Sequence, residues 1–141
     1  MTLKELREYL EENAEFLDSG LSREVYTRNQ RWVWKLPYDG SLDDGDHGNL
    51  IESNCYSSGL YTWEGRNYLA KCKLVKTSDN RNVLVMERVE KLFVRVIRPG
   101  GAVLESKIDK LPEWANELDG KQIGRSRKGE LVCFDFGNLK D

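Results

Sequence analysis

The spacing of apolar residues changes along the chain, and each spacing predicts a type of element. Near the start, leucines recur every three or four positions or at multiples of that spacing (Leu3, Leu6, Leu10 and Leu17), which places them on one helix face. Thr2 and Glu5 have the spacing of a capping box, in which each side chain bonds to the backbone of the other residue. We therefore expect a helix from Thr2 to about Leu17 that packs on the core.

After this helix the pattern becomes that of short strands separated by turn residues. Residues 15–37 predict three strands, with turns at Gly20 and at Asn29-Gln30. Further strands are expected at 68–76, 82–89, 92–97 and 130–134, and short helices at 49–59 and 112–118. Because most strands follow one another directly, we expect an α+β domain with a mostly antiparallel sheet.

Composition narrows the class of protein. The chain has 141 residues, the length of one domain, and a formal net charge of −2, so we expect neither nucleic acid nor an anionic membrane as a partner. Three cysteines without metal or redox spacing indicate reduced core thiols. A single histidine, His47, gives no basis for a histidine metal site or a Ser-His-Asp triad. The charged N-terminus and the lack of a long apolar run predict a cytoplasmic protein without a signal peptide or membrane span.

The segment richest in candidate chemistry is 131–138, where an apolar strand ends in Asp135-Phe136-Gly137. The tripeptide alone is also ordinary strand-to-turn chemistry. It resembles the magnesium-binding motif of protein kinases, in which the aspartate holds the metal that bridges the ATP phosphates. Other kinase-like features precede it in the family's order, so that the resemblance covers about residues 16–138.

By this resemblance, the nucleotide-contacting positions of the family fall in the first two thirds of the chain. Lys35 takes the position of the strand lysine that binds phosphates, and Glu52 that of its helix partner. The other implied nucleotide-contacting residues are Gly20, Val25, Val33, Met86 as gatekeeper, and the hinge residues Glu87 and Val89. Asp18 and Arg23 stand in the glycine-rich loop where small residues are usual, which argues against close approach of phosphate to the backbone.

The catalytic loop of the family aligns less well with this chain. Counting back from Asp135 places Gln122 at the metal-binding asparagine and Glu117 at the catalytic aspartate, with Asp119 as a competing base. Glu117 and Gln122 keep the functional group but lengthen the side chain by one methylene, a displacement that catalysis tolerates poorly. The resemblance implies Asp135 and Gln122 as metal ligands, and ATP with Mg²⁺ as the cofactors of an active form.

The implied fold is a kinase small lobe, with a mostly antiparallel five-stranded sheet and one packed helix. We expect one domain over 1–141, made of an N-terminal helix (1–17), a small-lobe-like part (18–89) and a rudimentary large-lobe remnant (90–141). Few residues separate the hinge from the catalytic-loop region, so we do not expect the family's peptide-substrate site. Compact, degenerate chains of this kind are similar to small kinase-like proteins of bacteriophages.

Three functional hypotheses follow. The first is a catalytically degenerate kinase-fold interaction module that binds and modulates or inhibits a host or viral protein. The second is an active ATP- and Mg²⁺-dependent phosphotransferase. The third is an α+β interaction domain unrelated to kinases, in which Asp135 is a turn residue and Lys35 a surface charge. We favour the first because it accounts for the altered glycine-rich and catalytic loops, although a fold alone does not determine a function.

Two features bear on partners. An aromatic group (Tyr56, Tyr61 and Trp63) forms either a contact surface or a cap on the core, and we favour the cap. A reduced large lobe leaves apolar surface on the small lobe, to be covered by a homo-oligomer or by the N-terminal helix. We favour the helix because its packing is intramolecular.

Overall fold

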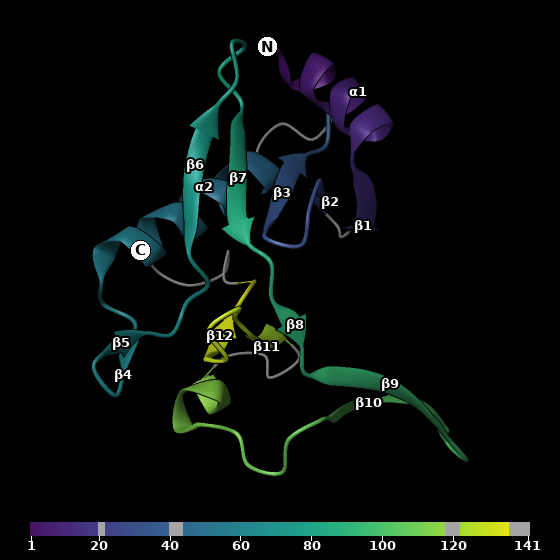
Figure 1. The fold of residues 1–141 in the computed structure, drawn as a ribbon, viewed down its shortest axis with the longest axis vertical. Helices are drawn as coiled ribbons and strands as arrows, with labels where there is room; N and C mark the ends of the chain where they lie inside the picture. Colours follow the sequence, from purple (N-terminus) through teal and green to yellow (C-terminus); the bar gives the residue numbers. More distant parts are fainter. Residues whose placement is uncertain (20–21, 40–43, 118–121, 136–141) are drawn as a thin grey trace.

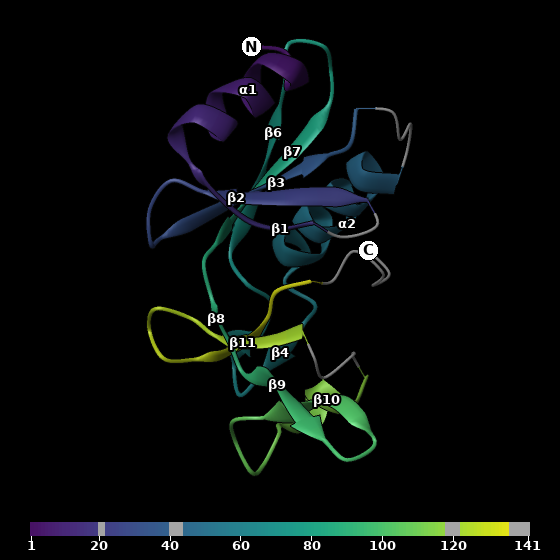
Figure 2. The ribbon, with the colours of Figure 1, turned by 90° about the vertical axis from the view of Figure 1, so that its right-hand side faces the viewer.

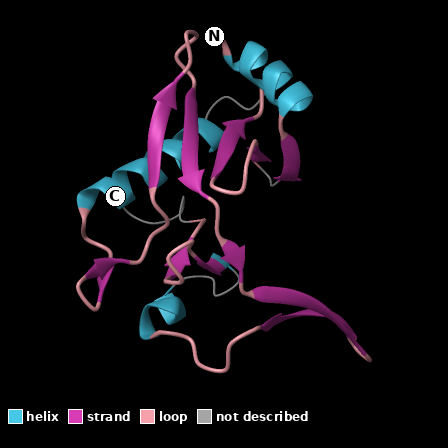
Figure 3. Cartoon of the chain, in the orientation of Figure 1, coloured by secondary structure: helices cyan, strands magenta, loops and turns pink. Residues whose placement is uncertain are grey.

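The computed structural model describes residues 1–19, 22–39, 44–117 and 122–135. These residues form an α+β protein with two α-helices and mostly antiparallel strands (Figures 1 and 3). In chain order the elements are α1 (Leu3–Asn13), β1 (Glu15–Ser19), β2 (Arg23–Thr27), β3 (Trp32–Pro37), α2 (Asp44–Ser58), β4 (Thr62–Trp63), β5 (Arg66–Asn67), β6 (Cys72–Lys76), β7 (Asn82–Glu87), β8 (Glu90–Lys91), β9 (Phe93–Arg98), β10 (Gly101–Ser106), the 3₁₀ helix η1 (Glu113–Glu117), β11 (Ile123–Arg125) and β12 (Leu131–Cys133).

The main sheet has five antiparallel strands in the order β1-β2-β3-β7-β6. Strand β3 lies in the middle, where Lys35 pairs with Val25 of β2 and Val33 pairs with Met86 of β7. Side chains of a strand alternate between the two faces of a sheet. Val33 and Lys35 therefore share one face, while Trp34 and Leu36 share the other.

The two helices cover opposite faces of this sheet (Figure 2). Helix α1 packs Leu3 and Leu10 against Leu36 and Val83, in a core of its own. Helix α2 contacts β3, β6 and β7 on the other face, where Leu84 and Met86 belong to the larger core. Because both faces are covered, the central strands β3 and β7 are rich in apolar residues.

Both helices have boundaries that differ from the prediction. Helix α1 has the expected capping box at Thr2 but ends at Asn13, because Ala14 is extended and the next residues pair in β1. Leu17 belongs to that strand and packs on the larger core. Helix α2 begins at Asp44 rather than at Asn49, and its extra turn carries Asp46, whose carboxylate accepts a hydrogen bond from the backbone N–H of Asn82 at 2.7 Å.

The start of α2 is also held by close packing. A Cβ on Gly45 would lie 2.6 Å from the Cβ of Pro37 and 2.5 Å from the backbone oxygen of Ser22. Glycine allows the helix backbone to approach β2 and β3 this closely. Gly45 thus serves a tight helix–sheet contact in the turn of α2 that precedes the predicted helix start.

The C-terminal part consists of short elements, and residues of η1, β11 and β12 pack into the larger core. Strands β8, β11 and β12 form a three-stranded sheet. Trp114 stacks on Tyr68 with ring centroids 4.5 Å apart. The backbone of Cys133 donates to Tyr68 at 2.7 Å and accepts from Ala70 at 2.7 Å. These contacts fix the chain that leads into Asp135.

Strand β9 was predicted, but its partner β10 was not. The two strands pair from Phe93↔Ser106 to Arg98↔Gly101 and form a hairpin that extends away from the rest of the protein (Figure 1). Helix α1 lies at the opposite end of the protein (Figures 1 and 2), so the expectation that it covers the C-terminal side of the sheet is wrong. Its leucines pack instead against Leu36 and Val83, on the face of the sheet opposite α2.

The expected aromatic cap is present, since its three rings are partly buried against the larger core (Tyr56, Tyr61 and Trp63). Within the described ranges, no helix is long and apolar enough to span a membrane.

Candidate functional site

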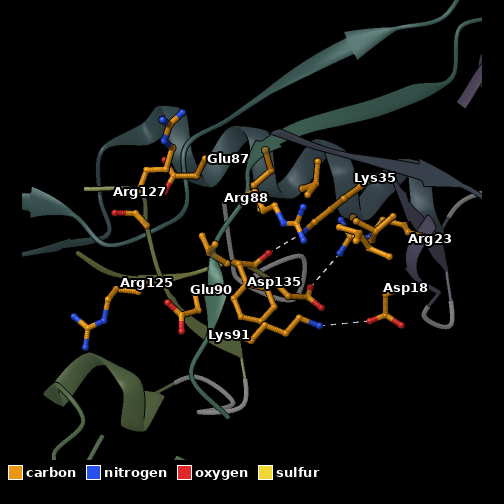
Figure 4. Close-up of a pocket in the computed structure, with 18 of the residues that line it drawn as sticks. Asp18, Arg23, Lys35, Glu87, Arg88, Glu90, Lys91, Arg125, Arg127 and Asp135 are labelled. Atoms are coloured by element: carbon orange, nitrogen blue, oxygen red, sulfur yellow. Dashed lines mark hydrogen bonds and ion pairs between the residues drawn. The ribbon is translucent and has the colours of Figure 1, made fainter. Parts of the chain in front are cut away.

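A cleft of about 1110 Å³ lies between the five-stranded sheet and the C-terminal pieces. Its apolar walls come from β1, β2, β3, β7, the β7–β8 connection and the end of β12 (Leu17, Val25, Val33, Met86, Val89 and Phe134). Its charged lining comes from the same elements, from β8, and from β11 and the β11–β12 turn; Figure 4 labels these charged residues. Apolar walls with a few converging charged groups are the usual composition of a small-molecule site.

Most of the predicted site residues meet at this cleft. Seven of them line it (Val25, Val33, Lys35, Met86, Glu87, Val89 and Asp135). Glu52 pairs with Lys35. Gln122 does not line the cleft, and its carbonyl instead accepts the backbone N–H of Phe134 at 3.0 Å. Gly20 and Asp119 lie outside the described residues, and so does the side chain of Glu117.

The predicted pair of Lys35 and Glu52 is present. The Lys35 ammonium lies 3.0 Å from Oε1 of Glu52, although the two residues come from a central strand and from a helix 17 positions away. Glu52 is fully buried and Lys35 is 6% exposed. Lys35 also donates to the carbonyl of Phe134 at 2.8 Å, which connects the ion pair to the segment that carries Asp135.

Arg23 is the principal residue that the sequence reasoning missed. Its guanidinium donates to both oxygens of Glu52, with Nη2 3.3 Å from Oε1, and it also reaches Asp135 Oδ1 at 3.1 Å. It thereby joins α2 to the C-terminal segment, and Figure 4 shows its contact with Asp135. The sequence offered one signal for this role. Arg23 and Val25 share a face of β2, and Val25 pairs with Lys35, so Arg23 lies on the same face of the sheet as Lys35.

These charges control the protonation of the site. Burial alone would raise the pKa of Glu52, but the charges and hydrogen bonds of Lys35 and Arg23 outweigh it and hold the pKa below its usual value. Burial alone would lower the pKa of Arg23. The charges and hydrogen bonds of Glu52 and Asp135 outweigh burial and raise the pKa above its usual value. The cluster therefore brings together two basic side chains, Lys35 and Arg23, and two acidic ones, Glu52 and Asp135.

Asn49 positions α2 relative to the sheet. It is fully buried, and its Nδ2 donates to the carbonyl of Lys35 at 3.0 Å and to that of Asn82 at 2.8 Å. Its Oδ1 accepts from Arg23 at 2.9 Å. Because residues three apart lie on the same helix face, these bonds also aim Glu52 at Lys35. The sequence prediction treated Asn49 only as a helix start.

The described residues do not fit a magnesium ion as they are placed. The Asp135 carboxylate already pairs with the Arg23 guanidinium. In the part of the chain that the structure describes, no three His, Cys, Asp or Glu side chains gather as a metal-binding group. A metal ion at Asp135 would have to displace a cation that belongs to the same network.

Two backbone N–H groups of the hinge, at Glu87 and Arg88, already form hydrogen bonds within the protein. The N–H of Glu87 donates to the carbonyl of Lys71 at 2.8 Å, and that of Arg88 donates to the carbonyl of Arg31 at 2.7 Å. The Arg88 side chain points into the cleft (Figure 4). Burial raises the pKa of Glu87 above its usual value.

Comparison with protein-family models and with curated proteins gave no match for this chain. The function is therefore argued from the site itself.

Proposed function

We propose that this protein is a catalytically degenerate, kinase-like interaction module that binds a protein partner and modulates or inhibits it. The observation that carries the proposal is Arg23, whose guanidinium holds both Glu52 and Asp135. By the resemblance to small bacteriophage proteins of kinase type, the partner that we propose is a host or viral protein.

The kinase-like part of the proposal is supported by three groups that meet from distant segments. Lys35 of β3 contacts Glu52 of α2, and Asp135 follows β12 and lines the same cleft. The sequence resemblance implied this convergence from the order of motifs alone. An unrelated α+β domain gives no reason for these three residues to meet.

Loss of catalysis is supported by the position of Arg23. A kinase-type aspartate acts by holding metal against the phosphates. Here the partner of Asp135 is a fixed guanidinium whose side chain is 12% exposed. Removing Arg23 from this position would leave the buried carboxylate of Glu52 with less positive charge around it, and an undercompensated buried charge is costly.

The binding part of the proposal is supported by the β9–β10 hairpin. Its exposed apolar residues lie on both faces: Val94 and Val103 on one, and Ile97 and Leu104 on the other. Ile97 is 78% exposed. Such residues gathered on one projecting element are typical of a protein contact surface. A two-stranded hairpin is only marginally stable by itself, so a partner's apolar surface would stabilise it.

A second candidate, an ATP- and Mg²⁺-dependent phosphotransferase, is favoured by one observation. The Lys35–Glu52 pair is intact at 3.0 Å, beside a cleft of about 1110 Å³. In this alternative, Arg23 would release Asp135 when nucleotide and metal enter.

A phosphotransfer assay separates the two candidates. The purified protein is incubated with γ-labelled ATP and Mg²⁺, with generic protein acceptors, beside Arg23→Ala and Asp135→Asn variants. We expect no metal-dependent transfer by the natural chain. Binding of Mn²⁺, followed by its electron paramagnetic resonance, is expected to be absent in the natural chain. Transfer by the natural chain that Asp135→Asn abolishes would establish the phosphotransferase instead.

The hairpin is tested with surface variants. Ile97→Lys combined with Leu104→Lys removes apolar contact without touching the core, and Leu60→Lys, at a residue that is 75% exposed outside the hairpin, is the matched control. A partner that is cross-linked to the natural chain should be lost by the hairpin variant and kept by the control. Equal capture by both variants would exclude the hairpin as the contact surface.

A further inference from the structure

Arg88 is a charged residue of the cleft whose hydrogen-bonding capacity is not satisfied. It lies between β7 and β8, and its side chain points into the cleft (Figure 4). Its Nη1 atom is buried without a hydrogen-bond partner, and no described carboxylate forms an ion pair with it. A buried donor without a partner costs free energy, and a charged one costs more.

The other buried cations of the cleft differ from Arg88 in this respect. Arg23 and Lys35 are neutralised by Glu52 and Asp135. Arg88 also borders a smaller cavity of about 340 Å³, but Glu12 and Glu15, which line that cavity, form no ion pair with it. None of the described carboxylates therefore neutralises Arg88, which lies among polar and apolar side chains of the cleft.

Of the four carboxyl groups that line the cleft, three are already paired with cations: Asp18 with Lys91, Glu90 with Lys107 and Asp135 with Arg23. The carboxyl beside Arg88 along the chain, Glu87, has its pKa raised by burial. Two further arginines at the rim, Arg125 and Arg127, make no ion pair within the described part of the chain and add positive potential at the entrance. Such a field raises the rate at which anions enter.

We propose that the cleft binds a small oxyanion-bearing molecule without a metal ion. Arg88 pairs with the oxyanion, and the body of the ligand lies against the apolar wall that includes Val33 and Val89. The guanidinium presents paired donors that match a phosphate or a carboxylate. This arrangement places the anion at Arg88 of the hinge rather than at the Asp135 carboxylate, and it needs no Mg²⁺.

The proposal is independent of the protein-binding function, because it rests on Arg88 rather than on Arg23 or the hairpin. Failure of small-molecule binding leaves the hairpin experiment unaffected. Loss of partner binding by the hairpin variant likewise leaves this cleft unchanged.

Isothermal titration calorimetry in the presence of EDTA tests the proposal with four probes. AMP carries a phosphate and an aromatic body, adenosine has the body alone, inorganic phosphate has the anion alone, and benzoate replaces the phosphate by a carboxylate. We expect AMP or benzoate to bind, adenosine and inorganic phosphate to bind more weakly, and added Mg²⁺ to give no increase in affinity. Whether AMP or benzoate binds more tightly identifies phosphate or carboxylate as the preferred group.

Variants assign the contact to Arg88. Arg88→Gln keeps the length of the side chain without its charge, and we expect it to weaken binding of the preferred anion about ten- to a hundredfold, the effect of losing a charged hydrogen bond. The control Arg95→Gln, on the exposed hairpin, should bind as the natural chain does. Circular dichroism checks that each variant is folded.

Three results would overturn the proposal. The first is that neither AMP nor benzoate binds at millimolar concentration in EDTA. The second is that Arg88→Gln, while folded, binds the anion as tightly as the natural chain. The third is that binding appears only when Mg²⁺ is added, which would move the anion to a metal-dependent site.

Discussion

Replacing Glu52 by Gln is the sharpest test of the buried ion cluster. The carboxylate is fully buried and contacts both Lys35 and Arg23. Glutamine has nearly the same size and shape, so the substitution removes one negative charge with little change in packing. Lys35, which is 6% exposed, then stays buried without that counter-ion.

The expected loss of stability is large. Removing one partner of a buried ion pair typically costs about 3–5 kcal/mol, because the other charge stays buried and uncompensated. Arg23 still has Asp135 at 3.1 Å, so the loss falls mainly on Lys35. We therefore expect the free energy of unfolding to fall by about 3 kcal/mol, and the melting temperature to fall by about 10–15 °C for a chain of this size.

Urea unfolding followed by tryptophan fluorescence measures the effect, since the chain has four tryptophans. Asp135→Asn is the matched control, because it removes a carboxylate from the same cluster at a side chain that is 44% exposed. A partly exposed ion pair contributes about 1 kcal/mol or less. The reasoning is wrong if Glu52→Gln costs no more than this control.

The pH dependence gives a second check on Glu52. Its pKa in the folded protein lies below its usual value of 4.5. The stabilisation is therefore complete above pH 4.5 and is lost as the pH falls through the folded-state value, where the carboxylate protonates. The difference in stability between the natural chain and Glu52→Gln should shrink in that acidic range. A difference that stays constant with pH would contradict an ionised Glu52.

Three other predictions use the same unfolding assay or a thiol reagent. Arg88→Met, measured without ligand, should raise the free energy of unfolding by about 1 kcal/mol, because it removes an unsatisfied buried donor; a loss of stability would show that Arg88 has a structural partner. Thr2→Ala should cost about 1 kcal/mol, because it removes the hydroxyl that accepts the backbone N–H of Glu5 at 3.1 Å; an unchanged midpoint would show that this capping bond contributes nothing. Burial raises the pKa of Cys72 and of Cys133 to about 12, so neither thiol should react with Ellman's reagent at pH 8 until the protein is unfolded, and rapid labelling of the native protein would contradict their burial.

The Lys35–Glu52 pair was implied by the resemblance to protein kinases, and local rules predicted only the strand and the helix that carry the two residues. Strand alternation placed Lys35 on the same face as Val33, and a helix was expected around Glu52. The strands β1, β2, β3 and β7 and the short helix η1 also lie close to their predicted ranges. In each case the pattern of apolar residues and turn residues reflects which face of the element is buried.

The missed features all depend on contacts between distant segments. Arg23 was interpreted as a bulky residue in a glycine-rich loop, whereas its long side chain crosses to α2 and to the C-terminal segment. Helix α2 begins early because Asp46 bonds to the backbone of Asn82, 36 positions away. Strand β10 pairs only with β9 and remains largely exposed, so it has no one-sided apolar pattern to reveal it.

By itself, the sequence determined the α+β class, the strand periodicity and the chemical types of the groups that meet at the cleft. These properties follow from local preferences and from which side chains must leave water. Only the tertiary structure decided which charge neutralises which. It placed Arg23 between Glu52 and Asp135 and left the Nη1 atom of Arg88 without a hydrogen-bond partner among the described residues. Ion pairing depends on distances of a few ångströms between residues far apart in the chain, and those distances are set by how the sheet, α2 and the C-terminal strands pack together.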